Sequence, residues 1–238
     1  WLGLQVDLSR RSPDEAERQR ADDLLGLITP VLKGYGTDKG YEVATNMQQI
    51  WGGHGYIREN GMDQFVRDAR ITMIYEGANG VQAMDLVGRK LASKGGRAVQ
   101  AFFAMVDANC AEAKAHAVVA AVAEKVEKAN GELKAATMWL MQNAMTNPEN
   151  AGAAAYPFMH LMGIVALGDM WVRTASHCAQ ALADGSAEAG LGRAFHEAKL
   201  VTARYFADRF TPDAGALRRK IEAGAESLMA LGAEVFAA

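Results

Sequence analysis

Cysteine, proline and aromatic residues are all scarce in this sequence of 238 residues, which has two cysteines, five prolines and 8% aromatic residues. Cys110 and Cys178 lie far apart and neither belongs to a CxxC pair, so the sequence predicts neither a disulfide framework nor a zinc site. Isolated thiols suit a reducing compartment, and we therefore expect a cytoplasmic location.

Histidine is also sparse, and the pattern of the histidines excludes a further class of site. No two of them have the spacing that would set two metal ligands on one helix face beside a carboxylate. We therefore expect no metal site, and we expect His160 and His177 to be capping or core residues. The full set is His54, His116, His160, His177 and His196.

Neither an excess of positive charge nor a long apolar run is present. Lys and Arg total 25 against 28 for Asp and Glu, a net charge of −3, so no nucleic-acid partner is expected. The uncharged stretch 151–168 is rich in Ala and Gly and is interrupted by Pro157 and His160, which favours a buried core helix over a membrane span. The chain begins with Trp1 and no signal-peptide pattern follows, and we expect it to be a piece of a longer protein.

The chain contains apolar residues at helical spacing along nearly all of its length. Half of the residues are apolar, which excludes a disordered chain, and no segment shows the strict alternation of a half-buried strand. The predicted fold class is all-α. A first helix is expected to start at Ser12 and to kink at Pro30, and a second to begin after Thr37 and stop at Gly52 and Gly53.

Further helices are expected downstream. Short ones should start near Met62 and after Asn79, and Gly95 should close the second. Longer ones, separated by Gly and Pro breaks and packed as an antiparallel bundle, are predicted for 97–129, 131–146, 157–183, 188–210 and 212–236.

The glycine-rich segment QIWGGHGY (residues 49–56) has two possible roles. Glycines beyond a helix end let backbone amides approach a phosphate, but the same residues also make an ordinary helix stop. No strand precedes the segment, so it is not the dinucleotide-binding fingerprint.

Glu76, in IYEG (residues 74–77), also has two possible roles. A carboxylate between an apolar run and a glycine could be a desolvated general base. It could also be an acid that stabilises the positive end of the next helix.

Taken together, four segments resemble the acyl-CoA dehydrogenase family in their order and spacing. They are GTDKGYEV (36–43), QIWGGHGY (49–56), RDARI (67–71) and IYEG (74–77). The resemblance implies the last part of the C-terminal helical domain of that family in residues 1–95. Residues 96–238 are similar to the helical extension carried by a longer branch of the family.

The resemblance implies an FAD enzyme of fatty acid metabolism that oxidises an acyl-CoA to the 2,3-enoyl-CoA. Glu76 corresponds to the catalytic base, which removes the α-proton while the β-hydrogen leaves as hydride to flavin N5, and its backbone N–H polarises the thioester oxygen. Tyr75 and Gly77 correspond to substrate-binding positions. The cofactor-binding positions are Gln49, Gly52, Gly53, Ala78 and Gly80, of which Ala78 and Gly80 replace the Thr and Gln of many relatives.

The resemblance also implies partners. Gln49, Gly52 and Gly53 would contact the FAD of a neighbouring subunit, so a homodimer or homotetramer is expected, with an acceptor such as an electron-transfer flavoprotein. Much of the flavin and CoA site would lie outside this chain, so the isolated chain is expected to be inactive and not to retain FAD. The alternative is a helical-bundle module for oligomerisation or interaction, without catalysis.

Overall fold

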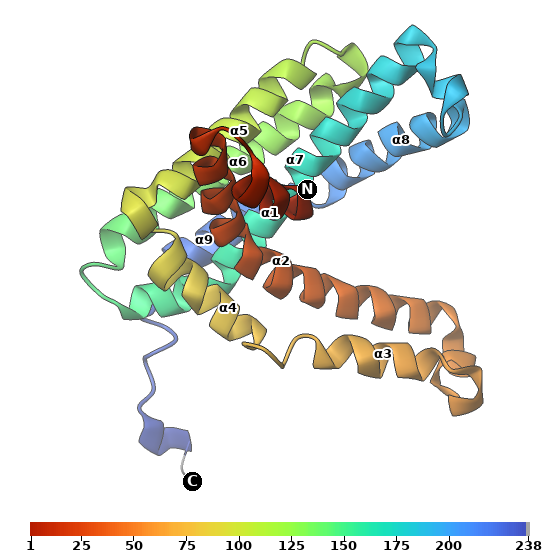
Figure 1. Cartoon of the computed structure of the whole chain (residues 1–238). Coiled ribbons are helices and arrows are strands. Elements are labelled where there is room, and N and C mark those ends of the chain that lie inside the picture. Colours follow the sequence, from red (N-terminus) through yellow and green to blue (C-terminus); the bar gives the residue numbers. More distant parts are fainter. Residues whose placement is uncertain (237–238) are drawn as a thin grey trace. The chain divides into compact units, whose positions relative to one another are not determined.

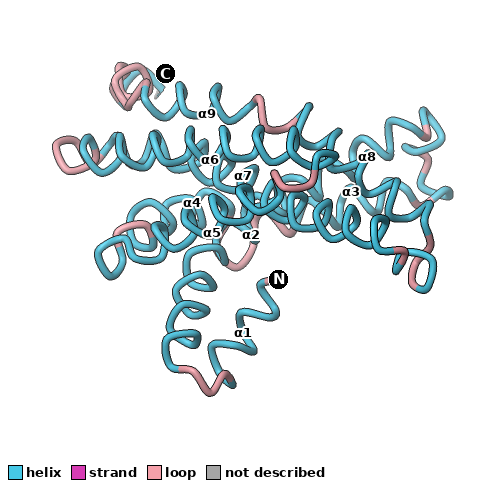
Figure 2. The backbone as a smooth tube through the Cα atoms, turned by 90° about the horizontal axis from the view of Figure 1, so that it is seen from above, coloured by secondary structure: helices cyan, strands magenta, loops and turns pink. Residues whose placement is uncertain are grey.

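The computed structural model describes residues 1–236, and every regular element within that range is helical (Figures 1 and 2). The chain divides into two compact units, one from Trp1 to Ala98 and one from Val99 onward. The predicted all-α fold class is therefore confirmed.

The first unit is built on one long helix. A short helix, α1 (Leu2–Arg11), packs along α2 (Glu15–Ile50), which also contacts α3 (Met62–Ile71) and α4 (Asn79–Asp85). Figure 1 shows α3 running beside the second half of α2. The chain then continues through a π-helical turn, Leu86–Lys90.

The start of α2 differs by two residues from the prediction. The N-cap is Asp14, whose carboxylate accepts a hydrogen bond of 2.9 Å from the backbone N–H of Ala16. Ser12 instead ends α1, and its hydroxyl accepts from the Asp14 N–H at 3.2 Å. Ser and Asp are both good N-cap residues, and Asp14, which directly precedes the first helical residue, is the N-cap.

The prediction that a second helix begins after Thr37 is wrong, because a single helix runs from Glu15 to Ile50. Pro30 lies inside it and is buried. Near the expected break, the Thr37 hydroxyl donates back to the carbonyl of Lys33 at 2.7 Å, so it satisfies its own polar group without interrupting the helix. Packing against α3 and α4 outweighs the weak helix propensity of the local glycines.

Asp23, Lys94 and Arg97 form a charged cluster in the first unit. The Asp23 side chain is only 5% exposed and accepts hydrogen bonds from Arg97 Nε at 2.6 Å and Lys94 Nζ at 3.0 Å. Burial alone would raise the pKa of Asp23, but the hydrogen bonds and charges of Arg97 and Lys94 outweigh it and lower the pKa overall. The cluster joins α2 to the end of this unit.

The second unit is a bundle around α7. Its helices are α5 (Arg97–Ala113), α6 (Ala117–Asn143), α7 (Glu149–Asp184), α8 (Arg193–Arg209) and α9 (Asp213–Glu222). Helix α7 contacts α6, α8 and α9, and its apolar side chains supply much of the core. The predicted breaks at Asn147-Pro148, Asp184-Gly185 and Thr211-Pro212 are confirmed.

Two other predicted features of this unit are wrong. No break occurs at Asn130, which is fully buried inside α6 and donates hydrogen bonds to the Phe103 carbonyl and the Asp107 carboxylate of α5. The chain turns earlier, between α5 and α6. The last helix ends at Glu222 instead of 236, and only a 3₁₀ turn, Ala233–Phe236, follows within the described residues.

Helix α7 has the length and hydropathy that a membrane-crossing helix would need. In the structure it is the core helix of its bundle, and 56% of its most apolar window is buried. It also carries Asp169, a charged residue type, at 0% exposure. Burial within the bundle accounts for its apolar character.

Candidate functional site

Glu76 lies on a tight left-handed turn between α3 and α4. The φ angles are 49° at Glu76 and 79° at Gly77, so a non-glycine residue adopts a conformation that normally favours glycine. The Glu76 side chain is exposed, and the desolvation expected for a base is not supplied by the described residues. The N-cap of α4 is Ala78 with no side-chain capping bond, so Glu76 does not cap the helix.

A polar network that the sequence analysis missed holds this turn against α2. Lys33 Nζ donates to the Gly77 carbonyl at 2.9 Å and to Asn79 Oδ1 at 2.8 Å. Asn79 is 4% exposed, and its Nδ2 donates to the Gly34 carbonyl at 3.0 Å and to Asp38 Oδ1 at 2.7 Å. No sequence signal indicated this network, because the partners of Lys33 lie 44 and 46 residues away.

Gln82 holds the turn from its other side. Its Nε2 donates to the carbonyl of Glu76 at 3.2 Å and to that of Gly77 at 3.4 Å. A Cβ added at Gly77 would lie 2.7 Å from this nitrogen, so a side chain there would displace Gln82. The positive φ favours glycine at position 77, and a side chain there would also cost the two Gln82 hydrogen bonds.

The remaining predicted residues near the turn lie at its surface. Tyr75 is 47% exposed, and the Lys33 ammonium is 6.0 Å from the centroid of its ring. Gly80 is exposed in the first turn of α4, and nothing lies within 4 Å of where its Cβ would be. The turn thus brings Tyr75, Glu76, Gly77 and Ala78 together, with Gly80 two residues beyond Ala78.

The second predicted group, Gln49, Gly52 and Gly53, lies at the far end of α2 and is exposed. Gln49 follows Lys33 by 16 residues, so a helical rise of about 1.5 Å per residue separates them by about 24 Å along the axis. The structure does not bring this group together with Glu76.

The local backbone requires glycine at some positions of this tip and not at others. Gly52 has a φ of +60°, and a Cβ on Gly55 would lie 2.6 Å from the Gln48 carbonyl oxygen. These two glycines are required by the 3₁₀ turn Gly52–Tyr56 itself. Gly53 has neither a positive φ nor any atom within 4 Å of its Cβ position, so the described fold does not require glycine there.

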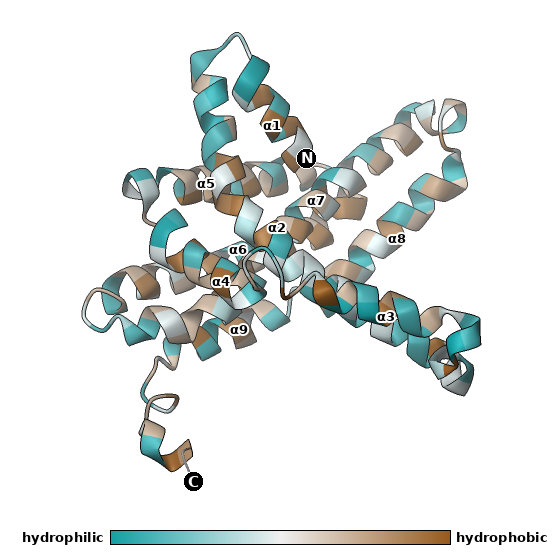
Figure 3. Cartoon of the chain, turned by 60° about the horizontal axis from the view of Figure 1, so that its bottom comes forward, coloured by the Kyte–Doolittle hydropathy of each residue, from teal (hydrophilic) through white to brown (hydrophobic). Residues whose placement is uncertain are grey.

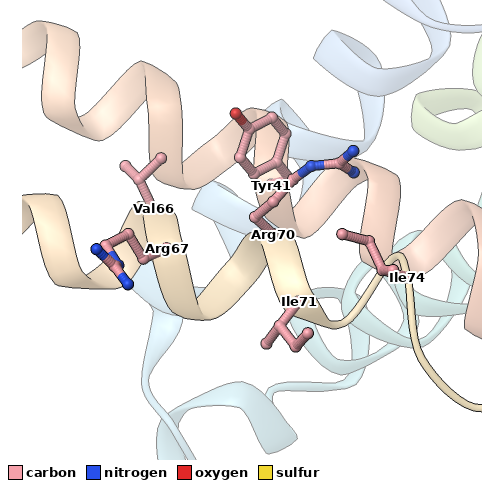
Figure 4. A pocket seen from close by; sticks show the side chains of 6 residues that line it. All are labelled: Tyr41, Val66, Arg67, Arg70, Ile71 and Ile74. Carbon is pink, nitrogen blue, oxygen red and sulfur yellow. The ribbon is translucent and has the colours of Figure 1, made fainter.

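An open groove of about 430 Å³ lies between α2 and α3, on the stretch between the turn and the tip (Figure 4). In Figure 4, Tyr41 and Arg70 lie close together, and the Arg70 guanidinium carbon is 5.8 Å from the ring centroid of Tyr41. None of the predicted site residues lines it. The groove is lined by Tyr41, Val66, Arg67, Arg70, Ile71 and Ile74.

The described residues offer no cluster of His, Cys, Asp or Glu that could hold a metal ion. His177 is exposed, so it is not a core residue, whereas His160 is half-buried beside Tyr156. Burial and the nearby Asp169 raise the pKa of Cys110 to about 12, and burial also raises the pKa of Cys178. Neither thiol is suited to act as a nucleophile at neutral pH.

Comparison with known families gives two matches that together cover most of the chain. Residues 14–92 match the model described as "Acyl-CoA dehydrogenase, C-terminal domain". Residues 102–232 match the model described as "Acetyl-CoA dehydrogenase C-terminal like".

Whole proteins of similar sequence carry related names. The 3-methylmercaptopropionyl-CoA dehydrogenase of Ruegeria pomeroyi is 35% identical over 95% of this chain and 38% of its own length. The broad-specificity linear acyl-CoA dehydrogenase FadE5 of Mycobacterium tuberculosis is 30% identical over 88% of this chain and 35% of its own. A butyryl-CoA dehydrogenase of Syntrophomonas wolfei is 24% identical over 87% of this chain and 34% of its own length.

The chain therefore spans little more than a third of the length of these relatives. The matches run through both compact units, and they include the segments that carry the Glu76 turn and the glycine-rich tip. The chain belongs to the acyl-CoA dehydrogenase family.

Proposed function

We propose that this chain is the C-terminal part of an FAD-dependent acyl-CoA dehydrogenase that oxidises an acyl-CoA to the 2,3-enoyl-CoA. The observation that carries the proposal is the turn at Glu76. It presents a carboxylate that caps no helix on a backbone held by Lys33 and Gln82. Family membership supplies the reaction class to which such a group is suited.

In this proposal Glu76 performs the proton transfer. An α-hydrogen beside a thioester is weakly acidic, so its removal needs a carboxylate oriented against it and protected from water. The Glu76 N–H makes none of the hydrogen bonds that hold the turn, which leaves it available to the thioester oxygen as negative charge develops there. FAD, when bound, would accept the β-hydrogen as hydride.

The described residues fit an FAD contact at the glycine-rich tip. Gly53 presents exposed backbone that the fold itself does not require to be glycine, and Gln49 lies one helical turn before it. The distance of about 24 Å from the turn favours contact with a different flavin from the one facing Glu76. We therefore propose a homo-oligomer, dimer or tetramer, in which subunits share their sites.

Uncovered apolar residues support the need for further protein around the first unit. Tyr56 is 82% exposed and Ile50 is 75% exposed, and both lie at the tip of α2. Other large apolar side chains exposed in this unit include Leu32, Val43, Phe65 and Ile71. Such a surface calls for partner segments, from the remainder of a longer chain or from another subunit. The same remainder would desolvate Glu76, so the isolated chain should be inactive.

Family membership supports the proposals for substrate and electron acceptor. The substrate class is an acyl-CoA, and the reduced flavin would pass its electrons to an acceptor such as an electron-transfer flavoprotein. We propose a cytoplasmic location, which two buried, unpaired cysteines suit.

Glu76→Gln in the full-length enzyme tests the proposal. Gln is nearly isosteric and keeps the backbone N–H, so FAD content and acyl-CoA binding should persist. Flavin reduction in anaerobic single turnovers should slow by about 10⁴-fold or more, because an amide cannot accept the α-proton. Glu59→Gln and Asp68→Asn, at exposed carboxylates, are the matched controls and should behave like the parent. A Glu76→Gln enzyme that reduces its flavin within about tenfold of the parent would contradict the proposal.

A second candidate function, assembly, concerns the second unit. Helix α8 has an exposed apolar stripe at helical spacing, which includes Val201 at 68% and Tyr205 at 58% exposure. The stripe consists of Ala194, Ala198, Val201 and Tyr205. If this unit serves oligomerisation, Val201→Glu with Tyr205→Glu should reduce the molar mass measured by light scattering. An unchanged mass would reject this role for α8.

A further inference from the structure

Glu76 and Gly77 adopt left-handed backbone conformations in succession, and this pair sets the direction of the Glu76 side chain. The φ angles are 49° and 79°. A glutamate in this region is strained, and it persists only where neighbouring groups hold it. The groups that hold it therefore bear on where its carboxylate points.

Lys33 is the charged member of that set. Its Nζ bonds the carbonyl of Gly77 at 2.9 Å and Asn79 Oδ1 at 2.8 Å, which joins the turn to the middle of α2. These partners are 44 and 46 residues away in the sequence, so the contacts are tertiary and not local. Hydrogen bonds from an ammonium group are stronger than neutral ones, and Lys33 contributes two at one point.

Asn79, the first residue of α4, fixes the C-terminal end of the same turn. It is buried, and its side chain has contacts with Gly34, Thr37 and Asp38 on one stretch of α2. The Lys33 ammonium adds to this anchor the bond to the Gly77 carbonyl, one peptide beyond Glu76. Without that bond, the side-chain hydrogen bonds to the carbonyls of Glu76 and Gly77 would come from Gln82.

We propose that Lys33 is a positioning residue for the Glu76 base: it fixes the left-handed turn so that the carboxylate and the Glu76 N–H face the same substrate. This inference rests on the proposed function. A displacement of about 1 Å at a reacting group can cost about 100-fold in rate, so a lost tether should affect proton transfer more than binding.

Lys33→Met in the full-length, FAD-loaded enzyme removes the ammonium and keeps the length of the side chain. The first readout is exchange of the α-hydrogens of a 3-thia acyl-CoA with D₂O, since this analogue has no β-carbon hydrogen to lose as hydride. The second is anaerobic flavin reduction by a normal acyl-CoA. We expect both rates to fall by about 10- to 100-fold, with FAD content and analogue affinity retained.

Two further variants separate positioning from a general effect. Lys33→Arg keeps a cationic donor and should recover part of the exchange rate. Lys39→Met, about one and a half turns along the same helix, removes a half-buried lysine that pairs with Glu42 at 2.6 Å and should leave both rates unchanged.

Three results would overturn the proposal: exchange in Lys33→Met close to the parent rate, no recovery in Lys33→Arg, or loss of FAD and helical structure in Lys33→Met, which would assign Lys33 to folding. Glu76→Gln is measured in parallel. If it retains α-hydrogen exchange, the proposed function itself fails. If it loses exchange while Lys33→Met keeps it, only the positioning role fails.

Discussion

The Asp169 carboxylate, in the middle of α7, accepts a hydrogen bond of 2.7 Å from the side-chain amide of Asn109 on α5. Its other oxygen, Oδ2, is buried with no hydrogen-bond partner in the described part of the chain, and Arg173 Nη1 lies 3.9 Å from it. Burial raises the pKa of Asp169, and the Asn109 bond and Arg173 oppose this only in part.

This relationship predicts that Asp169 lowers stability at neutral pH. The folded chain binds the proton more tightly than the unfolded chain, so stability falls as pH rises from the unfolded pKa of about 4 through the raised folded pKa. Asp169→Asn keeps the acceptor and removes the charge. It should raise the free energy of unfolding by about 1 to 3 kcal/mol at pH 7 and by little near pH 4.

Urea unfolding followed by circular dichroism across this pH range measures the effect. Asp184→Asn is a control of opposite sign, because hydrogen bonds from Ser186 and Gln180 lower the pKa of exposed Asp184. That variant should lose stability at pH 7 and match the parent in acid. A less stable Asp169→Asn chain at pH 7 would show that the buried charge is compensated.

Asp23→Asn should weaken the first unit. The lowered pKa of Asp23 means that its contribution is present above the unfolded pKa of about 4 and is lost as pH falls through the folded pKa. Arg97 and Lys94 are half-exposed, so we expect a loss of about 1 to 2 kcal/mol at pH 7. Asp22→Asn, at an exposed carboxylate 3.8 Å from Lys94, should change little. Equal effects of the two substitutions in urea unfolding would count against the Asp23 cluster.

Gly53→Ala and Gly55→Ala should separate cofactor contact from folding. A Cβ at Gly55 would lie 2.6 Å from backbone and 2.8 Å from Trp51 Cβ, so Gly55→Ala should destabilise the tip by about 1 to 3 kcal/mol. Gly53→Ala has open space around it and should leave stability unchanged, yet weaken FAD binding in the full-length enzyme. Thermal unfolding and FAD titration test the pair. Unchanged FAD affinity in Gly53→Ala would argue against a flavin contact at this position.

The purified 238-residue chain should be helical but should carry no flavin. Its predicted FAD contacts are a few exposed groups at two places about 24 Å apart, which is too little to hold the cofactor. Circular dichroism and visible absorbance test this directly. A yellow preparation with one flavin per chain would mean that the described residues bind FAD by themselves.

The sequence could predict helices and most turns because those signals are local. The spacing of Leu24, Ile28 and Val31 marks a buried helix face, and all three residues are buried. The breaks at Pro148, Gly185 and Pro212 follow from backbone chemistry at single residues.

One error and one omission concern polar residues whose partners are distant in the sequence. Asn130 read as a turn residue, but its side chain bonds Phe103, 27 residues earlier, and this contact satisfies it inside α6. Lys33 gave no functional signal because its contacts with Gly77 and Asn79 exist only after α4 packs on α2. Glu76 could be singled out from its sequence neighbours, whereas the groups that orient it could not.

The unbroken course of α2 has a consequence for insertions and deletions. A helix is a screw, so one residue inserted between Lys33 and Gln49 would turn everything beyond it by about 100° as well as advance it by about 1.5 Å. Seven inserted residues would nearly restore the angle but move Gln49 about 10 Å farther out. The neighbouring α3, which contacts α2, carries both hydrophilic and hydrophobic residues (Figure 3). A rotation of α2 would therefore bring different residues of α2 against α3. The stretch between Lys33 and Gln49 should therefore tolerate changes of residue type far better than any change of length.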